Sequence, residues 1–135
     1  LLQRGYTVIL TGSREDAAVC GSVAGDLPVI NLAGQTDLSD TLYVVKHANL
    51  VVCNDSMILH MASAFKIPTV AIFCATSPKF GYGPWKNRAI VVEKKGLACK
   101  PCRPHGSQVC PEGTDACMQD LPPEDVLAAI NKVAG

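Results

Sequence analysis

The chain has 135 residues with twelve basic and twelve acidic side chains that cancel, which fits one domain with a core of useful size. Because no block of one charge occurs, the composition argues against a nucleic-acid partner and against a membrane surface held by charge. No apolar run approaches the roughly 18 residues that cross a bilayer and no secretory leader opens the chain, so we expect a cytoplasmic protein.

Apolar runs bounded by turn residues alternate with helix-period segments, which predicts an α/β fold with a mostly parallel sheet and flanking helices. The chain opens without Met, on the apparent last turn of a helix closed by Gly5, so we expect a fragment of a longer protein. The first expected elements are a strand at 6–11, a helix at 14–24, a strand at 29–31, a helix capped by Asp37, a strand at 50–53 and a helix at 56–65. They are followed by a strand at 69–73, a loop at 74–85, a strand at 89–92, an irregular cysteine-bearing loop at 96–118 and a helix from Pro122 to Ala134.

The sequence changes abruptly from a buried-strand pattern to a helix pattern at Asn54-Asp55-Ser56. Asp55 or Ser56 can cap the first amides of the helix with its side chain, while the other amides and the positive end of the helix dipole stay open to an anion. His60 follows one turn later, over the same face. These residues leave two interpretations open, an anion site and an ordinary capped helix with a histidine in the core.

Three loops leave predicted strand ends in the same direction, at 11–15, 54–57 and 75–78. In an open parallel sheet such loops lie along one edge, where ligands bind, and a diphosphate is the simplest anion that fits their amides and hydroxyls. Thr11 and Gly12 would then line the ligand, and Glu15 could accept hydrogen bonds from a ribose diol, unless it is a solvated carboxylate of the first helical turn. Neither a Gly-x-Gly-x-x-Gly fingerprint nor a Walker loop occurs, which argues against a dehydrogenase or an ATPase.

Four of the seven cysteines lie within the irregular loop: Cys99, Cys102, Cys110 and Cys117. Four thiolates can hold a structural zinc ion tetrahedrally and would tie down a loop with little core of its own. Free thiols, disulfides and an iron–sulfur cluster stay open as alternatives. Cys20, Cys53 and Cys74 fall in or beside predicted core elements, so we expect them to be small buried hydrophobes.

Several motifs resemble, in order and spacing, the C-terminal half of glycosyltransferase family 9, the family of ADP-heptose:lipopolysaccharide heptosyltransferases. They are Leu32-Ala-Gly-Gln-Thr-Asp-Leu38, Ala48-Asn-Leu-Val-Val-Cys-Asn-Asp-Ser56, Leu59-His60-Met-Ala-Ser-Ala64, Pro68-Thr-Val-Ala-Ile-Phe73 and Thr76-Ser-Pro78. The cysteine loop that ends at Cys117-Met118 resembles a subset of the family. Two positions depart from the pattern: Met57 stands where the family usually has glycine, and Gln35 stands in the family's Gly-Lys-Thr/Ser element.

The resemblance implies the GT-B architecture, in which two Rossmann-like domains face each other across a cleft. Residues 1–135 would be the C-terminal domain, which binds the nucleotide-sugar donor. By motif match, Asp55 would contact the sugar side of the donor, Ser56 and the backbone of Met57 would meet the diphosphate, His60 would complete that pocket, and Glu15 would accept from the ribose. No catalytic residue is expected in this chain, because the resemblance puts the base in the missing N-terminal domain.

The function implied by the resemblance is transfer of a sugar, with heptose expected, from a nucleotide-sugar donor to lipopolysaccharide or a related glycan or lipid-linked acceptor. An ADP-sugar is the favoured donor, and no cofactor is required for transfer. The expected place is the bacterial cytoplasm, at the inner face of the membrane, with peripheral membrane contact only through the full-length protein. Alone, the fragment should bind nucleotide and transfer nothing. Two alternatives remain at this point, a nucleotide-sugar epimerase of GT-B architecture and a non-catalytic binding module with a metal-stapled loop.

Overall fold

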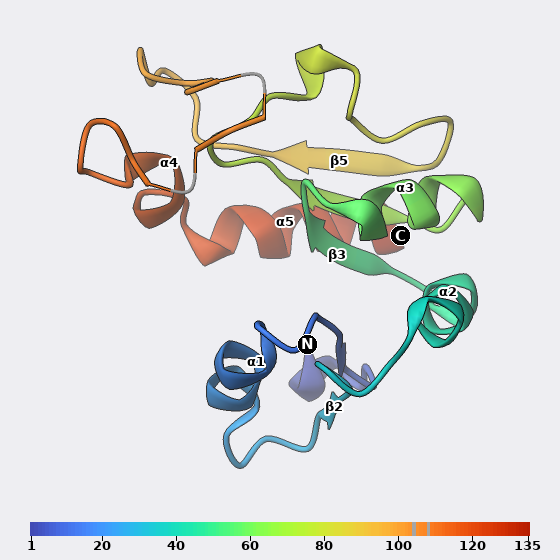
Figure 1. Cartoon of the computed structure of the whole chain (residues 1–135). Helices are drawn as coiled ribbons and strands as arrows, with labels where there is room; N and C mark the ends of the chain where they lie inside the picture. The colour runs from blue at the N-terminus through green and yellow to red at the C-terminus, as the bar shows by residue number, and fades with distance from the viewer. Residues whose placement is uncertain (104, 108) are drawn as a thin grey trace. The chain divides into compact units, whose positions relative to one another are not determined.

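The computed structural model describes residues 1–103, 105–107 and 109–135. The chain divides into two compact units, Leu1–Val44 and Val45–Gly135. Their elements are drawn in chain order from blue to red in Figure 1. In the described part of the chain, no helix combines the length and the apolar character that crossing a membrane requires.

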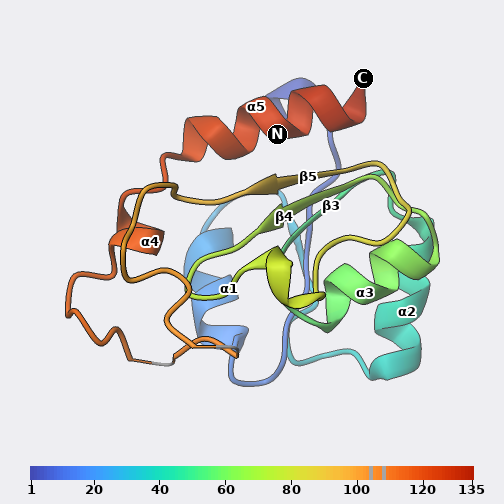
Figure 2. The same cartoon turned by 90° about the horizontal axis from the view of Figure 1, so that it is seen from above.

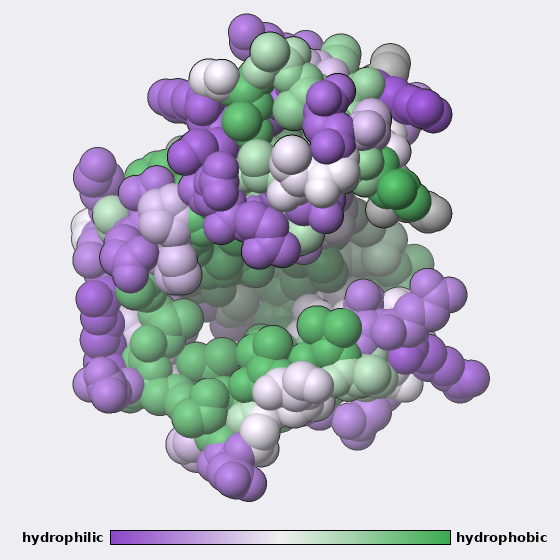
Figure 3. All heavy atoms as spheres, turned by 90° about the vertical axis from the view of Figure 1, so that its left-hand side faces the viewer, coloured by the Kyte–Doolittle hydropathy of each residue, from purple (hydrophilic) through white to green (hydrophobic). Residues whose placement is uncertain are grey.

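The first unit is small and has little buried core. It contains the 3₁₀ helix η1 (Leu2–Arg4), strand β1 (Ile9–Leu10), helix α1 (Ala17–Ala24), strand β2 (Ile30–Asn31) and the start of helix α2 (Leu38–His47). Strands β1 and β2 pair in parallel. Among the described residues of this unit, Ala33 is the one buried hydrophobic residue. Large apolar side chains instead reach the surface, as in Val19, 66% exposed, and Val23, 59% exposed. Figure 3 shows this hydrophobic surface in green in its lower part.

Helix α2 begins with a reciprocal pair of carboxylate caps. The amide of Asp40 donates to Asp37 Oδ1 at 2.8 Å, and the amide of Asp37 donates to Asp40 Oδ2 at 3.3 Å. This is the arrangement of a capping box, with Asp at the position where Glu is usual. The predicted role of Asp37 as a cap is confirmed, and Asp40 completes it.

The second unit holds a three-layer arrangement. Its elements are β3 (Val51–Asn54), α3 (Met57–Ala64), β4 (Thr69–Ile72), the 3₁₀ helix η2 (Pro78–Phe80), β5 (Ala89–Val92), α4 (Ala116–Gln119) and α5 (Pro123–Ala134). The strands are parallel in the order β3-β4-β5, with Val51 opposite Thr69 and Thr69 opposite Ala89. Helix α3 packs on one side of this sheet and α5 on the other (Figure 2).

The core of the second unit lies between α5 and the sheet. Ile130 and Val133 of α5 are 2% and 1% exposed, and they pack with Val70 of β4 and Val92 of β5. Burying a side chain of this size contributes roughly 1.5–3 kcal/mol. On α3, Leu59 is fully buried. Because β4 is the central strand, covered by helices on both faces, its sequence is a continuous apolar run rather than an alternating one.

The predicted α/β fold with parallel strands and flanking helices is confirmed, and β5 and α5 occupy the predicted residues closely. Several bounds were wrong. The strands predicted at 6–11 and 29–31 shrink to two residues each, and Ile9 and Ile30 within them are 42% and 47% exposed. The helix predicted from residue 14 begins at Ala17, because residues 14–16 form a turn. The strands belong to two sheets, and the irregular cysteine loop includes the short helix α4.

Candidate functional site

The turn between β3 and α3 lies at the carboxyl end of the three-stranded sheet. Asp55 follows β3, and its amide donates to the carbonyl of Ile72, the last residue of β4, at 3.2 Å. Ser56 is the extended N-cap residue of α3, yet its side chain makes no capping hydrogen bond within the described chain. The predicted side-chain cap is therefore wrong. The start of this helix has amides that no cap of its own shields, which is the arrangement that an anion can use.

The side chains around this turn are open to solvent. Asp55 is half-buried, Ser56 and His60 are exposed, and Met57, the first residue of α3, is 57% exposed. The interpretation of His60 as a core histidine is therefore wrong, because the buried face of α3 is formed by its neighbours, Leu59 and Met61 among them. The side chain of Met57 therefore stands at the surface, at the start of α3.

The loop at 75–78 lies at the same edge of the sheet. It follows β4, which pairs in parallel with β3 so that Asn54 stands opposite Ile72. In this loop, Ser77 is 8% exposed, and its hydroxyl accepts a hydrogen bond of 3.3 Å from the amide of Lys79, which caps η2. The prediction that strand-end loops share one edge is thus confirmed for 54–57 and 75–78.

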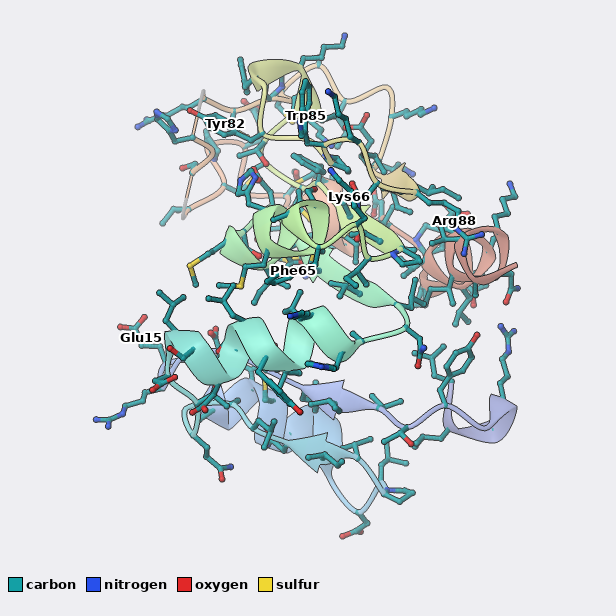
Figure 4. The ribbon with its side chains drawn as sticks, turned by 90° about the vertical axis from the view of Figure 1, so that its right-hand side faces the viewer. Glu15, Phe65, Lys66, Tyr82, Trp85 and Arg88 are labelled. Carbon is teal, nitrogen blue, oxygen red and sulfur yellow. The ribbon has the colours of Figure 1, made fainter. Side chains whose placement is uncertain are left out.

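The loop at 11–15 belongs to the first unit, and its geometry is local. Ser13 donates from its amide and its hydroxyl to Asp16 Oδ2, at 2.8 and 2.7 Å. These two hydrogen bonds lower the pKa of Asp16, and the bond from the Ser13 hydroxyl has the larger effect. A Cβ on Gly12 would lie 2.7 Å from the Cβ of Asp16, so only glycine fits there. Thr11 is half-buried, and Glu15 extends from the surface (Figure 4).

Gly34 packs against this same loop within the first unit. Its amide donates to the carbonyl of Gly12 at 2.9 Å, its φ is +72°, and a Cβ there would lie 3.2 Å from the Cα of Arg14. Both the close approach and the positive φ require glycine. The neighbouring Gln35 turns its side chain back, with Nε2 donating to the carbonyl of Asn31 at 2.9 Å. Asp16 was not singled out from the sequence, although Ser13 three residues before it was a usable signal.

The seven cysteines are free thiols, and they group differently from the prediction. Cys53 is buried, as predicted, but Cys20 and Cys74 are only half-buried. Burial, followed by the charges of the nearby Cys74, Cys102 and Cys110, raises the pKa of Cys117. Among the residues that the structure describes, no three His, Cys, Asp or Glu side chains lie as metal ligands must. The geometry therefore gives the zinc set Cys99, Cys102, Cys110 and Cys117 no support.

Lys100 anchors the cysteine loop to the carboxyl end of the sheet. Its Nζ donates to the carbonyl of Phe73 and to Glu93 Oε2, both at 2.7 Å, and the Lys100 side chain is 8% exposed. The amide of Cys102 adds a bond of 3.0 Å to the carbonyl of Ala75. Sequence reasoning missed Lys100, because a lysine between two cysteines looks like a solvated spacer. The loop it holds lies beside the 75–78 loop.

Comparison with known proteins agrees with this geometry. The sequence profile described as "Glycosyltransferase family 9 (heptosyltransferase)" matches residues 1–111. Lipooligosaccharide heptosyltransferase 2 of Campylobacter jejuni serotype O:6 is 34% identical over 110 residues, which are 81% of this chain and 33% of that protein. The solved structure of E. coli ADP-heptose lps heptosyltransferase II superposes with a TM-score of 0.78 at 27% identity, covering 98% of this chain and 38% of that one. The chain thus spans about a third of the length of the relatives it matches.

Proposed function

Because the chain belongs to glycosyltransferase family 9, we propose that it is the donor-binding domain of a glycosyltransferase that moves a sugar from a nucleotide-sugar donor to lipopolysaccharide or a related glycan. The observation that carries the proposal is the uncapped start of α3 at the carboxyl end of the parallel sheet, beside Asp55 and Ser56. Nucleotide ligands of open α/β sheets bind at this edge. The E. coli protein named for ADP-heptose supports an ADP-sugar as the donor and heptose as the sugar.

The roles of the residues follow from the chemistry of the donor. The amides of Met57 and its neighbours and the hydroxyl of Ser56 would bind the diphosphate, and His60, one turn on, would contact it from the exposed side. The carboxylate of Asp55 would accept from sugar hydroxyls, because it would repel phosphate. For the 11–15 loop of the first unit, taken by itself, we propose that Thr11, Gly12 and Glu15 are nucleoside contacts, with Glu15 accepting from a ribose diol.

The proposed reaction is attack of an acceptor hydroxyl on the anomeric carbon, with the nucleoside diphosphate as leaving group. Negative charge grows on the diphosphate in the transition state, so amides aimed at it from the start of α3 stabilise the transition state more than the bound donor. The base that takes the acceptor proton, and the acceptor site, are assigned to a second domain. The transfer proposed here uses no cofactor, and it takes place at the cytoplasmic face of a bacterial membrane.

Calorimetry with ADP, UDP, GDP and ADP-glucose tests the donor site. We expect one nucleoside diphosphate to bind preferentially, with ADP favoured. Ser56→Ala should weaken ADP binding about tenfold, the effect of losing one hydrogen bond to a charged group. Asp55→Asn should weaken binding of the ADP-sugar and leave ADP binding nearly unchanged, because Asp55 is assigned to the sugar.

Asp120→Asn is the matched control, since Asp120 is an exposed carboxylate that follows α4. It should change neither affinity. Failure of all three nucleotides to bind, or equal effects of Asp55→Asn and Asp120→Asn, would remove the proposed site. Family membership does not favour the epimerase or the binding-module alternative. The epimerase alternative would nevertheless be favoured if the protein converted a donor to its epimer without an acceptor.

A further inference from the structure

Positive charge is segregated within the second unit. From Ser56 to Val92 the sequence contains no Asp or Glu, but it contains Lys66, Lys79, Lys86 and Arg88. The zero net charge of the whole chain hides this, because the balancing carboxylates lie elsewhere in the sequence. Lys100 forms an ion pair with Glu93, and among the described residues none of these four cations forms an ion pair with a carboxylate.

Two of these cations lie beside the single tryptophan of the chain, and Arg88 follows it three residues later. Lys66 Nζ lies 3.4 Å from the carbonyl of Trp85, and Lys86 Nζ lies 5.2 Å from the centre of its ring. Arg88 lies at the same end of the sheet, where its carbonyl accepts a bond of 2.9 Å from the amide of Thr69 at the start of β4. Figure 4 shows Lys66, Trp85 and Arg88 on the face turned to the viewer. We call Lys66, Trp85, Lys86 and Arg88 the amino-edge patch.

The patch lies at the end of the sheet opposite to the candidate donor site. Thr69 and Ala89 begin β4 and β5, whereas Asp55 contacts Ile72 at the end of β4. A ligand on the patch therefore leaves the start of α3 open. The two sites can be tested independently of one another.

The backbone around Trp85 is held firmly, although its side chain is 66% exposed. The amide of Trp85 donates to Ser63 Oγ at 3.0 Å, and that hydroxyl donates to Asn87 Oδ1 at 3.2 Å. Asn87 Nδ2 donates in turn to the carbonyl of Ile67 at 2.9 Å and to Thr69 Oγ1 at 3.1 Å. A fixed loop thus presents the indole to solvent, which lowers the entropy lost when the ring is bound.

Local effects do not account for the whole patch. Lys66 comes just after α3, where the helix dipole favours a cation, but Lys86 and Arg88 follow no helix. Exposed tryptophan flanked by lysine and arginine is the side-chain combination that settles at the interface of anionic bilayers, where the indole enters the headgroup layer and each cation adds to the attraction. We propose that the amino-edge patch binds the surface of an anionic phospholipid bilayer.

The single tryptophan reports on this contact directly. On addition of vesicles of phosphatidylglycerol and phosphatidylcholine, the emission of Trp85 should shift to the blue, acrylamide should quench it less, and the protein should sediment with the vesicles. Vesicles of phosphatidylcholine alone should give neither effect, and raising the salt from about 0.05 to 0.5 M should release the protein, since a charge-driven contact is screened.

Variants distinguish binding through the amino-edge patch from binding through any pair of surface lysines. Lys66 and Lys86 have φ values of +60° and +53°, and asparagine tolerates this conformation, so Lys66→Asn with Lys86→Asn preserves the backbone. This pair should lower affinity for anionic vesicles at least tenfold. Lys94→Asn with Lys95→Asn, after the other end of β5, is the matched control and should leave it unchanged. Equal loss in both pairs, an unshifted Trp85 emission, or a shift caused by an oligonucleotide and not by vesicles would overturn the proposal.

Discussion

Cys53 is the thiol that the fold protects most. It is 9% exposed, and burial, followed by the negative charge of Asp55, raises the pKa of Cys53 to about 11 from its ordinary value of 9.0. A raised pKa means that the folded protein prefers the neutral thiol. The stability associated with this preference is complete below about pH 9 and is lost as the pH rises towards 11.

We predict that Cys53 reacts slowly with iodoacetamide. At pH 8 a thiol of pKa 11 has about a hundredfold less thiolate than one of pKa 9, and the thiolate is the form that reacts. Mass spectrometry can follow alkylation at each cysteine, and Cys53 should react far more slowly than Cys110. The pKa of Cys110 is lowered mainly by a hydrogen bond from the amide of Asp115. Asp55→Asn should speed the reaction of Cys53, while Asp120→Asn should not. Alkylation of Cys53 as fast as Cys110 would contradict the burial argument.

Met57 is the exposed first residue of α3, next to the proposed donor site. We predict that Met57→Ala tightens ADP binding several-fold, because it removes an exposed side chain from the first helical position and keeps a good helix former. Calorimetry measures the affinity, and urea unfolding should show a change within about 0.5 kcal/mol, as for most surface substitutions. Met118→Ala in α4 removes a similarly exposed methionine and should change neither quantity. Unchanged or weaker ADP binding by Met57→Ala would show that the side chain does not restrict the site.

At the scale of elements, the sequence predicted those whose own residues carry a clear local signal. The prolines at the start of α5 predicted that helix, and the apolar run from Thr69 predicted β4. The strand at 6–11 was overestimated, because a pattern of apolar residues does not say how much of a strand will find a pairing partner. The turn after β3 was predicted from its own residues. The grouping of Cys74 with Cys117 was not, because it depends on how distant loops pack.

Lys100 is the element-scale contact that the sequence did not reveal, and it offers a clear test. We predict that Lys100→Met lowers the free energy of unfolding by about 2 kcal/mol, because it leaves Glu93 and the carbonyl of Phe73 without their donor. Urea unfolding measures this. Burial raises the pKa of Cys74, and the positive charge of Lys100 opposes that rise, so the variant should alkylate more slowly at that thiol. Lys95→Met removes an exposed lysine nearby and should change neither result; if the two variants behave alike, Lys100 is not an anchor.

At the scale of the whole chain, buried apolar surface is distributed unevenly. The second unit has a core on both faces of its sheet, whereas the first has two short paired strands and Ala33 as its described core residue. Hydrogen exchange follows the free energy of local opening, which is small where few apolar side chains are buried. The two units should therefore differ in protection even if the chain unfolds in one step in urea.

Native-state hydrogen exchange tests this difference. In the unmodified protein, amides of β3, β4 and α5 should be protected by the full free energy of unfolding, and amides of β1, β2 and α1 by several kcal/mol less. Ile130→Ala removes a side chain that is 2% exposed in the core of the second unit, and it should lower protection there by roughly 2–4 kcal/mol while leaving the first unit nearly unchanged. Ile30→Ala, at a position 47% exposed in β2, is the matched control and should shift protection in the second unit by less than about 0.5 kcal/mol. Equal protection of both units, or an equal response of both to Ile130→Ala, would mean that the chain opens as a single cooperative body despite its uneven core.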